Sequence, residues 1–344
     1  MNFKKIILLI LAIIIIGVAV FGYKYYNKIY APNVLEDTSV YISSNSDFNQ
    51  ILKEIDPLIN NSKSFEWVAK QKNYPNVIKA GRYLIKKGMS NNDLINLLRS
   101  GKQTPLNLTF NNQDSLEKLS GRIASQIEAD SIQILSALTD KDFLLKNNLN
   151  KANVLGIFVP NSYEIYWNTS AASFRDRMLK EYQRFWNDSR TSKAKQLNLS
   201  KNEVITLASI VQKETSKVSE RTTVAGLYLN RYRDHWALQA DPTIIFALKQ
   251  KHGQNYEVKR VLNDDLTIDS PYNTYKNVGL PPAPIAMPDI SSIDAVLNAK
   301  NHEYYYMCAS VSNIGSHEFA RTLAQHNRNA VKYQQWISKQ GINR

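Results

Sequence analysis

The residue with the clearest capacity for chemistry is Glu214, near the end of the segment EVITLASIVQKETSKVSER (203–221). Val204, Leu207 and Val211 recur at the spacing of one helical face, and the same spacing continued by three residues reaches Glu214. A carboxyl group held against apolar surface keeps its proton to a higher pH, as a general acid requires. A glutamate at a helix end can also simply face solvent. The periodicity therefore leaves two interpretations open, a general acid and an exposed, fraying helix end.

The elements that would position Glu214 are two helices and a set of polar loops. Ser200, with Glu203 three residues later, forms a capping box that marks the start of the first helix. A second helix is expected from about Glu220 to Tyr232. The chain beyond it is rich in Asn, Tyr, Thr, Gln, His and Pro, in the segments LQADPT, SPYNTYKNVGLPPAPIAMP and GSHEFARTLAQHNRN. Such loops can be plain connections, but paired prolines hold a path rigid, and aromatic and amide groups suit a carbohydrate site.

The N-terminal sequence predicts a membrane anchor. An uncharged run begins at Ile6 and ends at Tyr23, and as a helix it is about 27 Å long, close to the roughly 30 Å hydrocarbon core of a bilayer. Lys4 and Lys5 precede the run and Lys24 follows it. A cleaved signal peptide is the alternative, but the run exceeds the ~7–15 residues of a signal h-region. We therefore expect a single-pass transmembrane helix followed by a domain on one side of the membrane.

Composition and charge limit the possible partners. With 43% hydrophobic and 21% charged residues, most of the chain is expected to fold around a core. The net charge of +13 is dispersed, which suits work near anionic lipid or an anionic wall polymer. Nucleic acid is the other partner that such charge could serve, but we find no recognition motif for it, and the apolar N-terminus argues against it. Cys308 is the only cysteine, which rules out an internal disulfide and a cysteine-based zinc site.

Two histidines, His317 and His326, raise the question of a metal site. They lie nine residues apart, without an HExxH pattern or a third ligand in sight, so neither a metal nor another cofactor is expected. His317 is then a candidate for the edge of a cleft, whereas His326 is expected to cap or pack.

The first part of the chain after the anchor predicts a small α+β module. The expected elements are a strand in TSVYIS, a helix over 48–59, a strand around 83–85, a helix that Ser90 caps and Gly101 ends, and a strand over 106–110. Residues 114–150 are expected to be helical and mostly polar, a further helix is expected from Ala171 to about Trp186, and NDSRTSKAKQLNLS (187–200) is expected to be a polar junction.

Several motifs together resemble the endolytic murein transglycosylases of the MltG/YceG-like family. They are ASIVQKET, SER…V…NR, LQADPT, YNTY…GLPP.PI and H.F…HN, in the family's order and spacing, over roughly residues 155–335. The likeness is looser in the N-terminal half, where GRYLIKKGMSNNDLINLLRSGK resembles a LysM-like module whose usual role would be contact with glycan. In that half the sequence departs from the family's pattern at two places. FNNQDS (110–115) stands where the family has a PEG-type turn, and LGIFVPNSY (155–163) stands where it has EGFLFPDTY. In the C-terminal part, Ala283 replaces a glycine that is common in the family.

The resemblance implies a domain organisation within an α+β fold. An N-terminal transmembrane helix would be followed by a small LysM-like α+β module and then by a mainly helical catalytic domain with rigid substrate-binding loops. The expected boundaries are an anchor and its flank over 1–30, the LysM-like module over 31–112, a connecting region over 113–190 and the catalytic transglycosylase domain over 191–344.

The resemblance also implies an activity. Such an enzyme is a membrane-anchored lytic transglycosylase that cleaves the MurNAc-β-1,4-GlcNAc bond of peptidoglycan without water and leaves 1,6-anhydro-muramoyl ends. Glu214 would serve as general acid and then as base, so a second carboxylate is not required. Gln212 stands where the family often has a second glutamate, which leaves Glu214 as the only acid in the motif. The family further implies a place on the extracytoplasmic side of the bacterial cell (inner) membrane, trimming or termination of nascent glycan strands, and an association with peptidoglycan synthases.

The substrate-binding residues are expected on the second helix and the polar loops. Glu220 could instead be a first-turn acid favoured by the helix dipole, and Asp241 could instead begin a helix with the proline that follows it. The expected set is Glu220, Asn230, Arg231, Gln239, Asp241, Thr243, Tyr272, Asn273, Thr274, Tyr275 and His317.

Two rival functions remain open. The first is a glycoside hydrolase, in which Asp241 or Glu220 activates water at ~5–9.5 Å from Glu214. The second is a membrane-tethered peptidoglycan-binding scaffold without catalysis.

Overall fold

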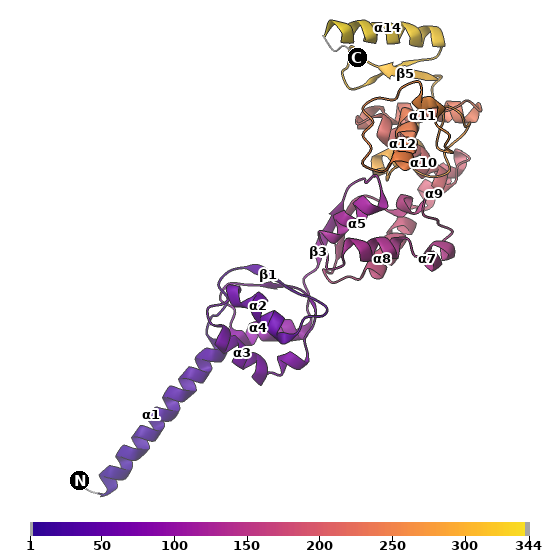
Figure 1. Cartoon of the computed structure of the whole chain (residues 1–344). Helices are drawn as coiled ribbons and strands as arrows, with labels where there is room; N and C mark the ends of the chain where they lie inside the picture. Colours follow the sequence, from indigo (N-terminus) through magenta and orange to yellow (C-terminus); the bar gives the residue numbers. More distant parts are fainter. Residues whose placement is uncertain (1–2, 341–344) are drawn as a thin grey trace. The chain divides into compact units, whose positions relative to one another are not determined.

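The structure is a computed structural model and describes residues 3–340. Within these residues the chain is mostly helical, and the predicted α+β class is confirmed (Figure 1). Three two-stranded sheets pair β1 (Thr38–Ile42) with β2 (Gly81–Ile85), β3 (Leu106–Phe110) with β4 (Asn161–Ile165), and β5 (Tyr306–Ala309) with β6 (His317–Ala320). Short 3₁₀-helices cover Asp56–Leu58, Tyr74–Asn76, Val154–Ile157, Val218–Glu220 and Asp265–Thr267.

Helix α1 (Phe3–Tyr30) is the one helix within residues 3–340 that is long and apolar enough to cross a membrane. None of its residues is buried, and Figure 1 shows it extending alone from the N-terminal unit. Only its last turns pack on protein, where the Tyr25 ring lies 5.4 Å from the Trp67 ring and Lys28 Nζ lies 5.3 Å from the Trp67 ring centre. Length and composition are therefore those of a single-pass anchor.

The chain folds into two compact units. Unit 1 runs to Leu108 and also takes in residues 126–129 and 163–170. Its globular part packs β1 and β2, an antiparallel pair, with α2 (Phe48–Ile55), α3 (Ser62–Gln71) and α4 (Asn91–Ser100) around one apolar core.

Local signals in unit 1 behave as the sequence predicts. The Ser90 side chain accepts a hydrogen bond from the Asp93 backbone at the start of α4, and Gly101 ends that helix in the left-handed region at φ 71°. The helix predicted over 48–59 is wrong at its end. It stops at Ile55 because Pro57 tightens the next turn into a 3₁₀-helix. Whether this unit is a LysM-like module stays a prediction, as does the division into four segments.

Unit 2 takes in residues 109–125, 130–162 and the rest of the described chain from Ala171. Its helices are α5 (Leu116–Ala124), α6 (Ser131–Leu138), α7 (Lys141–Lys146), α8 (Ala171–Phe185), α9 (Asp188–Gln196), α10 (Lys201–Glu214), α11 (Arg221–Arg233), α12 (Asp241–His252), α13 (Ile290–Leu297) and α14 (Leu323–Lys339). The prediction of a polar junction over 187–200 is wrong, because α9 occupies most of it. Helix α9 has almost no apolar periodicity and buries only Ala194, and the Asn187 side chain caps its start by accepting a hydrogen bond from the Arg190 backbone.

The core of unit 2 is built around α10. The predicted capping box is confirmed, since the Ser200 side chain accepts from the Glu203 backbone while the Glu203 carboxylate accepts from the Ser200 backbone. Every residue of α10 from Val204 to Val211 is buried, and α11, α12 and α13 pack around it. The loop with the paired prolines closes on the same helix, because the Ser209 hydroxyl accepts a hydrogen bond of 3.0 Å from the Ile285 backbone.

Helix α11 depends on a close approach at Gly226. A Cβ at this position would lie 2.3 Å from the Lys300 carbonyl oxygen and 2.7 Å from His302 Nε2. Gly121, on α5, is also helical, but a Cβ there would have no neighbour within 4 Å. Only the first glycine is therefore required by packing.

These two glycines make a matched test of the packing. We expect Gly226→Ala to lower the free energy of unfolding by about 2–3 kcal/mol, since the backbone at Lys300 must move. We expect Gly121→Ala to raise it by up to about 1 kcal/mol, because alanine is the better helix former. Chemical denaturation of both variants measures the difference, and equal effects would contradict the close approach.

Candidate active site

Glu214 is the last residue of α10, and its carboxyl group sits at the end of the buried helix with part of its surface still exposed. The Tyr228 hydroxyl, from α11, donates a hydrogen bond of 2.5 Å to Glu214 Oε1. Burial raises the pKa of Glu214 from its ordinary 4.5 to about 7, although the bond from Tyr228 acts in the opposite direction by favouring the ionised form. The acid is thus poised to hold or release a proton near neutral pH.

Three charged or titratable groups also act on Glu214. His317 and Arg231 lower its pKa, whereas the Asp241 carboxylate raises it. These three side chains come from β6, α11 and the first position of α12. Elements far apart in the sequence therefore converge on one carboxyl group.

Arg231 is held in place by backbone carbonyl groups. Its Nε donates to the Tyr305 oxygen at 2.8 Å, and its Nη1 donates to the Leu238 oxygen at 2.5 Å. The guanidinium also lies 5.7 Å from the Trp236 ring centre and 5.9 Å from that of Tyr306. Burial lowers its pKa, but an arginine keeps its charge at neutral pH. It supplies a fixed positive charge beside the acid.

Asp241 and Tyr275 form a second polar pair near the acid. The Tyr275 hydroxyl donates to Asp241 Oδ1 at 2.5 Å, and Asp241 is exposed. The loop before α12 is bent through Gln239, which has a φ of 52°, and the Gln239 backbone donates to the Thr274 oxygen at 3.0 Å. A non-glycine residue in this region is strained, and such strain gathers at functional sites.

Glu220 and His317 form a third group, in which the carboxylate holds the histidine. His317 Nδ1 lies 2.9 Å from Glu220 Oε1, and the His317 backbone donates to Glu220 Oε2 at 3.1 Å. Thr215, the residue after Glu214, donates its hydroxyl to Glu220 as well. Burial would raise the pKa of Glu220, but these hydrogen bonds outweigh it and hold the pKa below its ordinary value. Glu220 is therefore an ionised group whose bonds fix His317.

Several of the predicted substrate-binding residues point into the protein. Asn273 and Thr274 are buried, and the Asn273 amide donates to the carbonyl groups of Leu266 and Ile268. The Asn230 amide likewise donates to backbone carbonyl groups. The Thr243 hydroxyl is within hydrogen-bond distance, 2.8 Å, of that of Thr274, and Tyr272 packs in the core. Saccharide contact by these five residues stays a prediction; the structure shows them shaping the loops.

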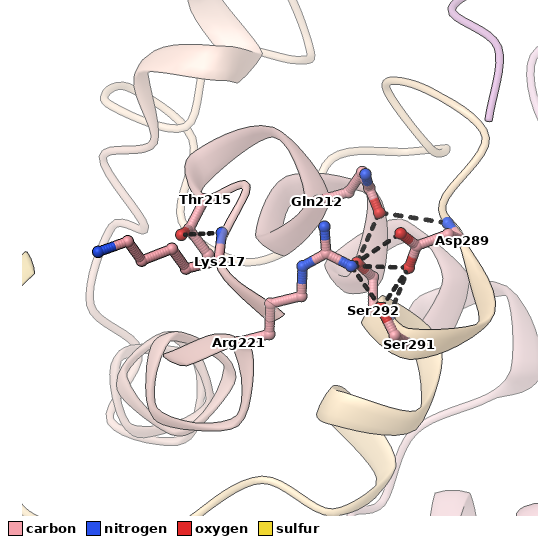
Figure 2. Close-up of polar contacts among 7 residues, drawn as sticks. All are labelled: Gln212, Thr215, Lys217, Arg221, Asp289, Ser291 and Ser292. Atoms are coloured by element: carbon pink, nitrogen blue, oxygen red, sulfur yellow. Dashed lines mark hydrogen bonds and ion pairs between the residues drawn. The ribbon is translucent and has the colours of Figure 1, made fainter. Parts of the chain in front are cut away.

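A polar network fixes the end of α10 to the start of α13 (Figure 2). Gln212 Oε1 accepts hydrogen bonds from the Asp289 backbone at 3.3 Å and from the Ser292 hydroxyl at 2.7 Å. The buried Arg221 donates from Nη1 to both carboxylate oxygens of Asp289 at 2.8 Å and to the Ser291 hydroxyl. These bonds set the position of the helix turn that carries Glu214.

The sequence analysis missed two residues of this site, Tyr228 and Thr215. Every residue of α11 from Val224 to Leu229 is buried, so the spacing marks no single face and does not assign Tyr228 to the site. Within residues 3–340, no group of three or more His, Cys, Asp and Glu side chains is placed to hold a metal ion.

The raised pKa of Glu214 predicts a dependence of stability on pH. Since the folded state binds the proton more tightly, the acid favours folding most below about pH 4.5, and this contribution is lost as the pH rises through about 7. Relative to Glu214→Gln, we expect the wild type to lose up to roughly 3 kcal/mol of unfolding free energy across this range. Urea denaturation between pH 4.5 and 8 measures it.

The control for this experiment is Glu257→Gln, at an exposed position. If the free energy of unfolding changes with pH in the same way for the wild type and for both variants, Glu214 does not have a raised pKa in the folded protein.

Comparisons with known proteins agree with the resemblance. The model of the YceG-like family matches residues 40–332. The endolytic murein transglycosylase of Bacillus subtilis (strain 168) is 31% identical over 309 residues, which cover 85% of this chain and 82% of that protein. The endolytic murein transglycosylase of Streptococcus pneumoniae serotype 2 (strain D39 / NCTC 7466) is 29% identical over 345 residues, and the match spans 91% of this chain but only 62% of the streptococcal protein.

A solved structure of a YceG-like protein is similar in fold to this chain. The 2.6 Å crystal structure of a YceG-like protein from Listeria monocytogenes superposes with a TM-score of 0.58 at 27% identity, covering 85% of this chain and 98% of the other. The family model covers most of the chain, and the Bacillus relative exceeds 30% identity over most of its own length. The chain belongs to the YceG-like family.

Proposed function

We propose that this chain is a membrane-anchored endolytic lytic transglycosylase that cleaves the MurNAc-β-1,4-GlcNAc bond of peptidoglycan glycan strands. The observation that carries the proposal is the carboxyl group of Glu214, which ends a buried helix and has a pKa of about 7. It lies in the segment that matches the family, and the Bacillus and Streptococcus relatives are named for this activity.

The proposed reaction uses one proton and no water. The Glu214 carboxyl group donates its proton to the glycosidic oxygen, and the bond from that oxygen to the muramoyl C1 breaks. The muramoyl 6-hydroxyl oxygen forms a new bond to C1, and its proton passes to the Glu214 carboxylate. The product is a 1,6-anhydro-muramoyl end, and the acid is regenerated. A pKa near the working pH makes both protonation states accessible to one group.

Tyr228 is proposed to keep its hydrogen bond to Glu214 in both the protonated and the ionised state of the acid. Its own pKa is raised well above the ordinary value, chiefly by burial, so the hydroxyl remains a donor at neutral pH. The hydrogen bond it donates strengthens when Glu214 is ionised, since a charged acceptor binds more strongly than a neutral one. Tyr228 thereby lowers the cost of proton release.

The exposed polar groups around Glu214 are the proposed substrate contacts. Asp241 and Tyr275 offer a carboxylate and a phenol at the start of α12, and Gln239 exposes its amide beside them. His317, oriented by Glu220, presents its other ring nitrogen away from that carboxylate. Amides, carboxylates and aromatic rings of this kind recognise sugar hydroxyl and N-acetyl groups.

The hydrolase remains the second candidate because of Asp241. Its carboxylate is near enough to raise the pKa of Glu214, and a second acid could activate water. Glu220 is a weaker candidate for that role, since hydrogen bonds from Thr215 and His317 already occupy its oxygens. A scaffold without catalysis would not require the raised pKa of Glu214.

Helix α1 supports a proposal about the location of the enzyme. We propose that α1 crosses the cell membrane once and that the catalytic unit lies on the extracytoplasmic side, where glycan strands are assembled. An enzyme tethered there would be well placed to trim or terminate nascent strands and to associate with peptidoglycan synthases. Contact between unit 1 and glycan would fit the same location.

The first test identifies the chemical structure of the new ends that the protein leaves on cleaved glycan strands. Full-length protein in detergent, incubated with uncrosslinked glycan strands, is expected to produce 1,6-anhydro-muramoyl ends detected by mass spectrometry. Glu214→Gln keeps the shape of the side chain but cannot donate the proton, so the rate should fall at least a thousand-fold. Reducing ends from the wild type would instead establish the hydrolase, and unchanged activity of the variant would remove Glu214 from the mechanism.

Tyr228→Phe tests the coupling between the two residues. Removing the hydrogen bond takes away an interaction that lowers the pKa of Glu214, so the decline of kcat/KM at high pH should shift upward from about pH 7 by up to about one unit. A pH–rate profile from pH 5 to 9 measures the shift. A lower rate with an unmoved profile would show that Tyr228 only supports the fold.

A further inference from the structure

A pocket in unit 2 lies beside the candidate active site and takes no part in the reaction proposed above. Its volume is about 120 Å³, close to the roughly 150 Å³ of a cavity that holds one benzene-sized molecule. Carbon side chains form much of its lining: Pro242, Ile245, Phe246 and Ile285. The pocket therefore has room for one small group that carries alkyl carbon.

The polar rim of the pocket is positively charged. Lys213 Nζ lies 2.5 Å from Asp114 Oδ1, and Lys118 Nζ lies 3.5 Å from Asp114 Oδ2. Lys249 also lines the pocket and is near enough to Asp114 to act on its charge. Lys118 does not line the pocket, so its charged lining consists of Lys213, Lys249 and Asp114, and Lys249 forms no ion pair among residues 3–340. An anionic group would complete this arrangement.

The pocket is lined by residues next to Glu214 and Asp241 along α10 and α12. Lys213 immediately precedes Glu214 at the end of α10, and Ile245 lies one helical turn after Asp241 on α12. A substrate held at Glu214 and Asp241 would thus have its neighbouring substituents within reach of the pocket.

We propose that this pocket is a subsite for a carboxylate-bearing alkyl substituent of the substrate, the peptide attached to the muramoyl residues. This inference rests on the proposed function. Sugar rings and their N-acetyl groups are neutral, which does not match the lysines of the pocket. An amino-acid residue with a methyl side chain and a carboxylate matches both the carbon lining and the lysines, with carbon against Ile245 and Phe246 and the anion at Lys249.

The kinetic test compares two substrates, peptide-bearing glycan strands and the same strands after their free carboxylates have been converted to neutral amides. For full-length protein in detergent, we expect Lys249→Ala to lower kcat/KM about ten-fold more on the strands that keep their carboxylates, the effect of one charged hydrogen bond. Lys249→Arg should restore most of the loss. Lys251→Ala, an exposed lysine two residues on along α12 that does not line the pocket, is the control and should leave the ratio of the two substrates unchanged.

A binding measurement separates failure of the subsite from failure of the proposed function. N-acetylalanine, a small alkyl carboxylate, is titrated against protein with isotope-labelled isoleucine methyl groups, with N-acetylalaninamide as the neutral control. We expect shifts at Ile245 and Ile285 with the acid only, lost in Lys249→Ala. Equal losses of kcat/KM on both substrates, or equal shifts with acid and amide, would overturn the subsite. The wild type could also fail to cut either substrate and still show shifts of the isoleucine methyl signals with N-acetylalanine only. That result would overturn the proposed function and support the anion site.

Discussion

The rest of the catalytic unit depends on the desolvation of one carboxyl group. Glu214 can have a pKa near 7 only if protein replaces water around it, and ionising it there is costly. The fold meets this condition by burying α10 along its length and ending the helix at the acid. Tyr228 and Arg231 then return part of the lost solvation to the ionised form. The balance between burial, Tyr228 and the charges of His317, Asp241 and Arg231 sets the pKa of Glu214, so a change to any of them is expected to move that pKa.

The chain on both sides of Glu214 is fixed by polar contacts of different kinds. Before it, Gln212 joins the end of α10 to the first turn of α13. After it, Thr215 leaves the helix in an extended conformation and donates to Glu220, which in turn holds His317. Such contacts restrict the movement of the carboxyl group to a small range, which a general acid needs because proton transfer depends strongly on distance. The site is thus preorganised by its supporting residues rather than by the acid itself.

Local signals made much of this arrangement predictable. The capping box at Ser200 and the helix that follows it depend on residues close in sequence, and both are confirmed. The prediction of a single apolar face is wrong, because α10 is buried on all sides, including Thr206 and Ser209. Tyr228 could not be assigned to the site from spacing alone, since its role depends on how α11 packs against α10. Asn273 shows the converse limit. Its polarity suggested a group that faces substrate, but the amide closes its own loop, and sequence does not show which way a polar side chain points.

The contacts of Gln212 are structural, and they fit our proposal of a single catalytic acid. Family resemblance places a second glutamate here, yet the contacts of Gln212 use only an oxygen that accepts from the Asp289 backbone and the Ser292 hydroxyl. A carboxylate could accept the same two bonds, so the geometry requires an acceptor at this position and not a proton donor. The neutral amide does not compete with Asp289 for the Arg221 guanidinium, and it adds no negative charge two residues before Glu214. Position 212 therefore belongs to the framework that holds α13, and the proton transfer that we propose needs only Glu214.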